Sequence, residues 1–243
     1  MLYRKSKSAL AQVAFLKIQL GDIVTDMRGK SGGMVYQKGR YGLIKRTKVT
    51  PVNPQSTSQQ DNRAIMASNA SAWRNLTDEE RQSWIDGSVK FPYSDIFGNR
   101  QTLSGNSLFN KLNNVLVANG HGVVNSCPAP VEVPIASVGA VSASAGGGTL
   151  SVAFTNTPVP ADFDLIVEAT PQRSAGAYFA KSSFKKMSIL PDGTGSPQAL
   201  GGTYTAMFGD LVEGQRIDIR IYLASQITGQ KGIATSTSIL VGA

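Results

Sequence analysis

Cysteine and histidine are almost absent from this sequence of 243 residues, which holds one of each, Cys127 and His121. A single cysteine excludes an intrachain disulfide, and these two residues cannot form a zinc site without a cluster of further ligands. Histidine is the commonest general acid or base in enzymes, and the only one here lies in a Gly-His-Gly sequence that is typical of a turn. We therefore interpret both residues as structural.

Long apolar runs are also missing. No stretch approaches the roughly 20 apolar residues that a membrane-spanning helix requires, so the sequence predicts no membrane partner. Near the N-terminus, Lys17 interrupts the apolar stretch. A signal peptide needs an uninterrupted apolar core and a small-residue cleavage site, so none is predicted.

Motifs for nucleotide and acid–base chemistry are incomplete. Gly29-Lys30-Ser31 matches the end of a Walker loop, but Val24 stands where that loop needs its first glycine. Two further glycines follow where the loop needs a helix. The acidic residues stand at a helix start, at a strand entrance and in turns, where capping and turn formation explain them. The sequence therefore predicts no catalytic, cofactor-binding or metal-binding residues and a protein that is not an enzyme.

The net charge of +8 is concentrated at the N-terminal end. Residues 1–50 hold eleven Lys or Arg against two Asp, a balance of +9. Residues 51–120 hold six charges of each sign, and residues 121–243 hold seven basic against eight acidic. The N-terminal fifth of the chain is therefore the segment that attracts an acidic partner.

Residues 1–54 are predicted to form a basic N-terminal arm that contains a β-hairpin. Two β-prone runs, 34–37 and 41–49, are joined by Lys-Gly-Arg, a glycine-containing connection that is typical of hairpins. The glycines that precede them favour a tight bend. Basic and aromatic residues are interleaved along this arm, and the predicted partner-binding residues are Arg28, Lys30, Tyr36, Lys38, Arg40, Tyr41, Lys45, Arg46 and Lys48.

Three interpretations of this arm are open. Its cations could bind phosphates while its tyrosines stack on bases, as in a nucleic-acid-binding protein. They could merely keep an exposed hairpin edge from aggregating, with Ile44 and Arg46 on one face and Lys45 and Thr47 on the other. The hairpin could also add to the sheet of a neighbouring protein and pair its cations with an acidic patch. We favour this last interpretation, because a glycine-rich segment that cannot bury its own apolar residues tends to order on a partner.

Residues 55–124 are predicted to form a small helical domain. Apolar residues recur near a 3.6-residue spacing within 56–76. A second helix begins at Thr77, where Thr-x-x-Glu and three acids make a capping box at the positive end of the helix dipole. A third helix, within 107–119, ends at Gly120.

The apolar residues of these helices are predicted to meet in one small core. Trp84 and Ile85 supply the apolar face of the second helix. We expect Trp73 and Trp84 to pack between helices rather than to bind a ligand, with Leu108, Phe109 and Leu112 of the third helix covering the same core.

The C-terminal half changes to a β pattern. Three prolines make residues 125–134 a stiff linker in which helix is blocked. Residues 135–243 are predicted to form an independent β-sandwich of about seven strands. The β-prone segments are 148–156, 163–171, 180–190, 203–208, 215–225 and 231–242, and the glycines at 146–148 are predicted to form a hairpin turn.

The end of the chain resembles the last two strands of a fibronectin type III or related immunoglobulin-like domain. A leucine, a turn glycine, an alternating strand, a glycine loop and a final strand recur in that family. The residues that match this outline are Leu211, Gly214, Ile217, Ile219, Ile221 and Gly229, whereas Arg216 lies near a position where tyrosine is usual. The resemblance implies an immunoglobulin-like sandwich.

Residues 21–120 resemble proteins found in tailed-bacteriophage genomes. Their pattern combines a glycine-rich entry, a basic hairpin, a Pro-x-x-Thr-x-x-Gln-x-x-x-Arg box, a Trp-x-x-Leu-Thr pair and a second tryptophan. In this sequence Arg63 falls one residue short of the last interval of that box. The matching residues are Gly32, Gly33, Arg46, Pro54, Thr57, Gln60, Arg63, Trp73, Leu76, Thr77, Arg81 and Trp84. The resemblance implies a structural component of the virion.

Together these observations predict an α+β multidomain protein: a basic β-hairpin arm at 1–54, a small helical domain at 55–124, a Pro-rich linker at 125–134 and an all-β immunoglobulin-like or fibronectin III-like sandwich at 135–243. The expected function is that of a non-enzymatic structural protein of a bacteriophage virion, made in the host cytoplasm and present in several copies. Its expected partners are capsid, portal, neck or tail subunits. The alternative is a nucleic-acid-binding protein that uses the basic hairpin.

Overall fold

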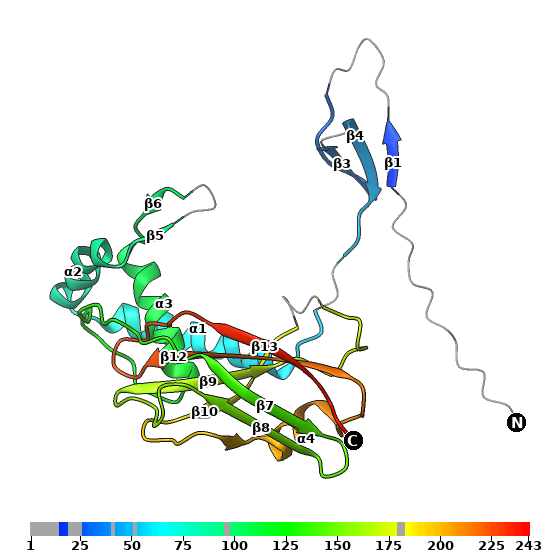
Figure 1. The fold of residues 1–243 in the computed structure, drawn as a ribbon. Helices are drawn as coiled ribbons and strands as arrows, with labels where there is room; N and C mark the ends of the chain where they lie inside the picture. The colour runs from blue at the N-terminus through cyan, green and yellow to red at the C-terminus, as the bar shows by residue number, and fades with distance from the viewer. Residues whose placement is uncertain (1–14, 19–25, 40–41, 51–52, 95–97, 179–182) are drawn as a thin grey trace, which may run out of the picture. The chain divides into compact units, whose positions relative to one another are not determined.

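The computed structural model describes residues 15–18, 26–39, 42–50, 53–94, 98–178 and 183–243 (Figure 1). It divides into two compact units, Met1–Ser56 and Thr57–Ala243. The described residues include four α-helices and several antiparallel sheets. The predicted α+β class is therefore confirmed.

The first unit contains a four-stranded antiparallel sheet in the order β1-β4-β3-β2. We call it the N-terminal sheet. Its strands are β1 (Phe15–Ile18), β2 (Gly29–Ser31), β3 (Met34–Gly39) and β4 (Gly42–Thr47). The two central strands pair from Met34↔Thr47 to Gly39↔Gly42. The sequence predicts two strands here; β1 and β2 were not predicted, because strands this short leave little pattern.

Three helices open the second unit: α1 (Thr57–Asn75), α2 (Asp78–Gly87) and α3 (Gly105–Ala118). The predicted capping box at the start of α2 is confirmed, because the Thr77 hydroxyl accepts from the Glu80 amide at 3.2 Å and the Glu80 carboxylate accepts from the Thr77 amide at 2.8 Å. Helix α3 starts two residues earlier than expected, with Ser104 as its cap. Gly120 adopts a φ of +91° just past the end of α3, as a terminating glycine does.

The helical core forms around Phe109. The rings of Trp73 and Trp84 each lie 5.2 Å from the Phe109 ring, the second in an edge-to-face arrangement. Trp84 is fully buried and its indole N–H donates to the Asn125 backbone oxygen at 2.5 Å. The predicted packing role of both tryptophans is confirmed, whereas Ile85 is 50% exposed and does not belong to the apolar face as expected.

Short elements connect α2 to α3: the 3₁₀ helix η1 (Ser88–Lys90) and a two-stranded ribbon of β5 (Tyr93–Ser94) and β6 (Arg100–Gln101).

The rest of the second unit consists of two antiparallel sheets. The larger has the order β10-β9-β12-β13 and the smaller β11-β8-β7. Their strands are β7 (Val138–Ser144), β8 (Thr149–Phe154), β9 (Phe163–Ala169), β10 (Lys185–Leu190), β11 (Gln198–Ala199), β12 (Arg216–Ser225) and β13 (Thr235–Leu240). The glycines at 146–148 form the predicted turn between β7 and β8.

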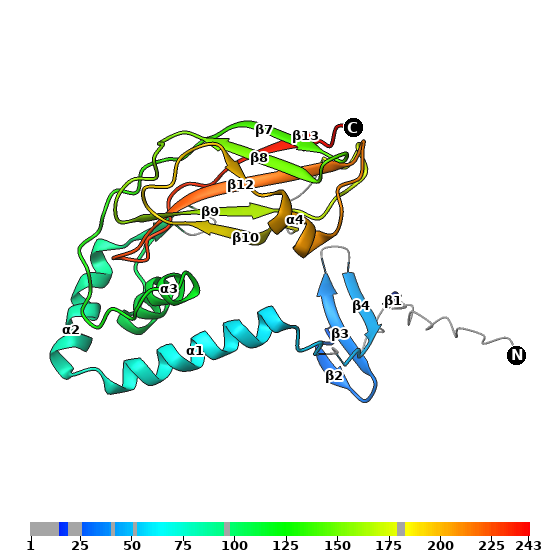
Figure 2. The same ribbon diagram turned by 90° about the horizontal axis from the view of Figure 1, so that it is seen from below.

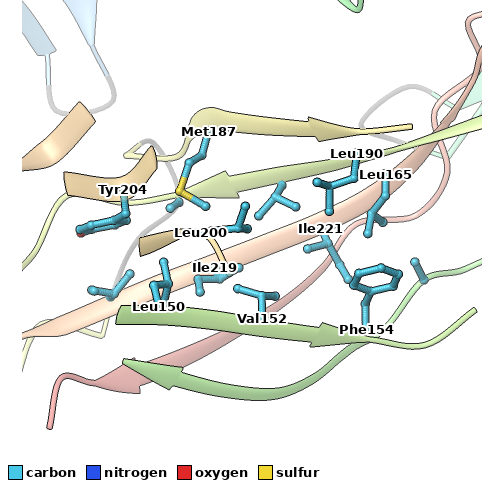
Figure 3. Packing of buried hydrophobic residues seen from close by; sticks show 14 of the residues in the cluster. Leu150, Val152, Phe154, Leu165, Met187, Leu190, Leu200, Tyr204, Ile219 and Ile221 are labelled. Atoms are coloured by element: carbon cyan, nitrogen blue, oxygen red, sulfur yellow. The ribbon is translucent and has the colours of Figure 1, made fainter. Parts of the chain in front are cut away.

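Both sheets contribute to one hydrophobic cluster. Alternate residues along each strand point into it, so that Leu150 and Val152 of β8 lie opposite Ile219 and Ile221 of β12 (Figure 3). The two isoleucines are fully buried. This cluster is the main core of the second unit.

The segment 203–208 was predicted as a strand, and this prediction is wrong: the structure has helix α4 (Gly201–Phe208) there. Tyr204 and Phe208 are four residues apart, a spacing that fits one face of either a strand or a helix. In the helix their rings stack with centroids 4.9 Å apart. The start of α4 is fixed by close packing, since a Cβ at Gly201 would lie 2.2 Å from the Gly148 oxygen.

Helix α3 lies between α1 and the larger sheet (Figure 2). Val115 of α3 packs against Ile166 and Tyr222 on the outer face of that sheet. Gly229, with a φ of +72°, approaches α3 so closely that a Cβ would lie 2.2 Å from the Leu112 oxygen. The helices and the sheets are therefore joined in one unit.

Residues 125–134, predicted as a linker, also pack within this unit. The Asn125 oxygen accepts the Trp84 hydrogen bond, and the Val131 amide donates to the Gln230 side chain at 2.7 Å. A Cβ at Gly232 would lie 2.9 Å from the Val133 side chain. The prolines exclude helix here, as expected, but the segment runs along the loop between β12 and β13.

Candidate functional site

The predicted partner-binding residues fall on both faces of the N-terminal sheet. Directly opposed residues of antiparallel strands share a face. The pairs Tyr36↔Lys45 and Lys38↔Leu43 therefore place the first aromatic residue and two of the cations on one face.

The opposite face carries two other predicted cations. Val35 pairs with Lys30 on β2 and with Arg46 on β4, so Lys30 and Arg46 flank one central valine. The split of Ile44 and Arg46 from Lys45 and Thr47 follows the alternation expected from the sequence. The seven predicted residues that the structure describes are therefore not gathered into one patch, and Arg28 and Lys48 flank the strands. Arg40 and Tyr41 lie outside the described residues.

Several of these cations are held by local partners. The Asp26 carboxylate lies 3.1 Å from the Arg28 guanidinium and 3.9 Å from the Lys38 ammonium group, and these side chains are well exposed. The Lys45 ammonium group lies 5.8 Å from the centroid of the Tyr36 ring. This cation covers one face of the ring that base stacking would need.

The N-terminal sheet buries little apolar surface among its described residues. Leu43, 9% exposed, is the one buried hydrophobic side chain among residues 26–38 and 42–50. Val35 and Ile44 are half-buried, and Met34 is 36% exposed. Small sheets need a hydrophobic face to be stable independently, and little of one is buried among these residues.

A second polar cluster lies on the outer face of the larger sheet. Both carboxylate oxygens of Glu168 on β9 are bound: one accepts two N–H groups of Arg220 on β12, and the other accepts the Tyr222 hydroxyl at 3.1 Å. The Lys231 ammonium group lies 5.4 Å from the Tyr222 ring centroid. Together with Gly232 and Ala234 these residues line a shallow hollow of about 220 Å³, which we call the outer hollow.

This cluster was not predicted from the sequence. Glu168 and Arg220 are 52 positions apart, and no local motif joins them. The available signal was the run Arg216, Asp218, Arg220 at alternate positions of an otherwise apolar strand, which indicates a polar outer face.

His121 joins the end of α3 to the start of β9. Its Nε2 lies 2.6 Å from the Asp164 carboxylate, which also accepts from the Gln226 amide at 2.9 Å. The Asp164 side chain is 3% exposed. The His121–Asp164 pair therefore links the segment after helix α3 to the start of β9.

Metal sites and membrane-spanning helices are not found in the described part of the chain. Its His, Cys, Asp and Glu side chains form no group of three or more that could hold a metal ion. None of its helices combines the length and apolar composition that crossing a membrane requires. The sequence matches no protein-family model, and comparison with curated proteins gives no significant match either.

Proposed function

We propose that this chain is a non-enzymatic structural component of a tailed-bacteriophage virion. In this proposal the N-terminal sheet docks on an acidic surface of a neighbouring virion protein. The observation that carries it is that, among residues 26–38 and 42–50 of the N-terminal unit, Leu43 is the single buried hydrophobic side chain.

The residues that resemble the phage proteins occupy structural positions. Gly32 and Gly33 form the turn between β2 and β3. Trp73, Thr77 and Trp84 build the corner between α1 and α2 and its core. A pattern made of turn, cap and core residues supports a scaffold that assembles rather than one that performs chemistry.

The strand order supports an immunoglobulin-like sandwich as the C-terminal part. With β7 to β13 lettered A, B, C, C′, E, F and G, the smaller sheet has the order E-B-A and the larger one C′-C-F-G, with α4 between E and F. Immunoglobulin-type sandwiches divide their strands between two sheets in this manner. Such a module would serve as an accessory domain of the particle.

Charge favours an acidic protein surface as the partner of the N-terminal sheet. Within the described residues 26–50, six Lys or Arg stand against Asp26. These cations lie on both faces of the sheet, an arrangement that fits insertion between acidic surfaces. A nucleic-acid clamp would instead gather them along one groove with open aromatic faces.

Hydrogen exchange of the isolated chain and of purified particles tests the proposal. We expect peptides from residues 29–50 to exchange rapidly in the isolated chain, because few apolar contacts protect them, and slowly in the particle. Mass spectrometry of the particles must also detect the chain. Slow exchange in the isolated chain, or absence from the particles, would refute the proposal.

A DNA-binding titration decides the alternative. If the sheet bound duplex DNA through about five phosphates, the logarithm of the binding constant would fall with the logarithm of salt with a slope of roughly −4 to −5. The triple variant Lys38→Ala, Lys45→Ala, Arg46→Ala would then lose binding, whereas Lys111→Ala on α3 would keep it. We expect no such salt-dependent binding.

A further inference from the structure

We propose that the outer hollow binds an anionic group, namely a phosphate, sulfate or carboxylate carried by a ligand. This inference is independent of the docking role, because the hollow is formed entirely by residues of the second unit. Strands β9 and β12, which form its floor, are neighbours in the larger sheet (Figure 1).

Two carboxylates of this face, those of Glu168 and Asp164, already have hydrogen-bond partners. Glu168 accepts from Arg220 through one oxygen and from Tyr222 through the other. Asp164 accepts from Gln226 and lies against His121. Neither carboxylate is therefore left to neutralise a further cation.

The basic side chains of this face are less completely paired with acidic ones. Arg220 is held by Glu168 and lies 4.3 Å from the Phe184 ring centroid. Lys231 rests on the Tyr222 ring, and it forms no ion pair with any residue that the structure describes. Lys186 donates to the Ala118 oxygen at the end of α3, at 2.5 Å. Near the outer hollow, Arg220, Lys231 and Lys186 thus stand against Glu168 and Asp164, and an incoming anion would balance the excess.

Repulsion between the two lysines supports the same conclusion. The pKa of Lys186 is lowered, first by burial and then by the positive charge of Lys231, against the attraction of Glu168 and Asp164. An anion between Lys231 and Arg220 would relieve this repulsion and would receive charge-assisted hydrogen bonds from both side chains.

The size of the outer hollow limits what it can hold. Its volume is about 220 Å³. This is less than the ~300 Å³ at which pockets for whole drug-sized ligands begin. We infer that the hollow takes one charged group and that the rest of the ligand lies across its open mouth.

An NMR titration of the full chain tests this inference with three probes: inorganic phosphate, glucose 6-phosphate and glucose. We expect both phosphates, and not glucose, to shift the amides of residues 231–234 and of Glu168. A response to inorganic phosphate alone would support a site for the free ion, and a response to both would support a site for a phosphate borne on a larger molecule. No response to either phosphate would overturn the inference.

Matched variants separate this site from general attraction by a basic protein. Lys231→Ala, at an exposed position that tolerates substitution, is expected to weaken phosphate binding about tenfold, since a hydrogen bond to a charged group is lost, and Lys231→Arg should retain it. Lys185→Ala is the control, because Lys185 lies over the Phe208 ring instead, and binding should be unchanged. Equal losses in the Lys231→Ala and Lys185→Ala variants would refute a defined site.

Discussion

Replacing Tyr204 with phenylalanine is expected to weaken the protein at neutral pH and to remove part of its sensitivity to alkali. Tyr204 lies in α4, is fully buried, and donates its hydroxyl to the Thr170 oxygen at 2.9 Å. Burial raises the pKa of Tyr204 from 10.0 to about 12. The folded protein therefore keeps this proton at a pH where the unfolded chain has lost it. The stability that results is fully present below pH ~10 and is lost as the pH rises from about 10 to about 12.

The Tyr204 hydroxyl affects the free energy of unfolding in two ways of similar size: through its hydrogen bond at neutral pH and through its raised pKa at alkaline pH. At neutral pH the substitution removes one hydrogen bond to a buried oxygen, which costs about 1 kcal/mol. For the native tyrosine, the difference between pKa values of 10.0 and about 12 destabilises the folded state by about 1.4 kcal/mol at pH ~11. The variant lacks this alkaline loss. Its free energy of unfolding should therefore lie about 1 kcal/mol below that of the native protein near pH 7 and should meet or pass it near pH ~11.

Urea unfolding followed by far-UV circular dichroism, at neutral pH and at several alkaline values, measures this difference. The control is Tyr93→Phe, since Tyr93 is partly exposed and its hydroxyl contacts the side chain of Gln101. We expect the control to stay parallel to the native protein. A gap between the native protein and Tyr204→Phe that is constant over the whole pH range would show that Tyr204 ionises alike in the folded and unfolded chains, and the reasoning would fail.

Three further substitutions test the packing of the second unit. Thr77→Ala should lower the free energy of unfolding by about 1 kcal/mol, because it removes the hydroxyl of the capping box, and Thr77→Ser should restore it in thermal unfolding. Gly229→Ala should lower the free energy of unfolding by more than about 3 kcal/mol, since φ is +72° and the new methyl group would meet the Leu112 oxygen. The control is Gly122→Ala, which has open space around it and should be nearly neutral in the same urea titration. Trp84→Phe should cost about 2 kcal/mol in chemical denaturation, because a buried N–H bond and part of the helical core are lost, and an unchanged midpoint would contradict that role.

The helical region shows where sequence reasoning succeeds. Capping residues and the 3.6-residue spacing act over a few positions, so Thr77, Trp84 and Gly120 reveal their roles locally. Helix α4 shows the opposite case. The spacing of Tyr204 and Phe208 suits either element, and the choice of helix depends on distant contacts with Thr170 and with the turn between β7 and β8.

The two candidate sites also differ in how far the sequence reveals them. The basic residues of the N-terminal segment are visible in the composition, but their division between two faces depends on the pairing of three strands. The outer hollow joins Glu168, Arg220 and Lys231, which meet only when β9 and β12 become neighbours. Long-range pairing of this kind leaves no signal in a short window of sequence.

The contact of α3 with the outer face of the larger sheet determines which pieces of this chain can exist alone. A fragment that began at residue 135 would keep both sheets but would uncover the apolar surface around Ile166, Tyr222 and Ala224 that Val115 shields. Exposed patches of this kind promote self-association. The sheets therefore do not form a module that can be moved without the helices. A recombination event or an expression experiment that transferred them alone would yield an insoluble product.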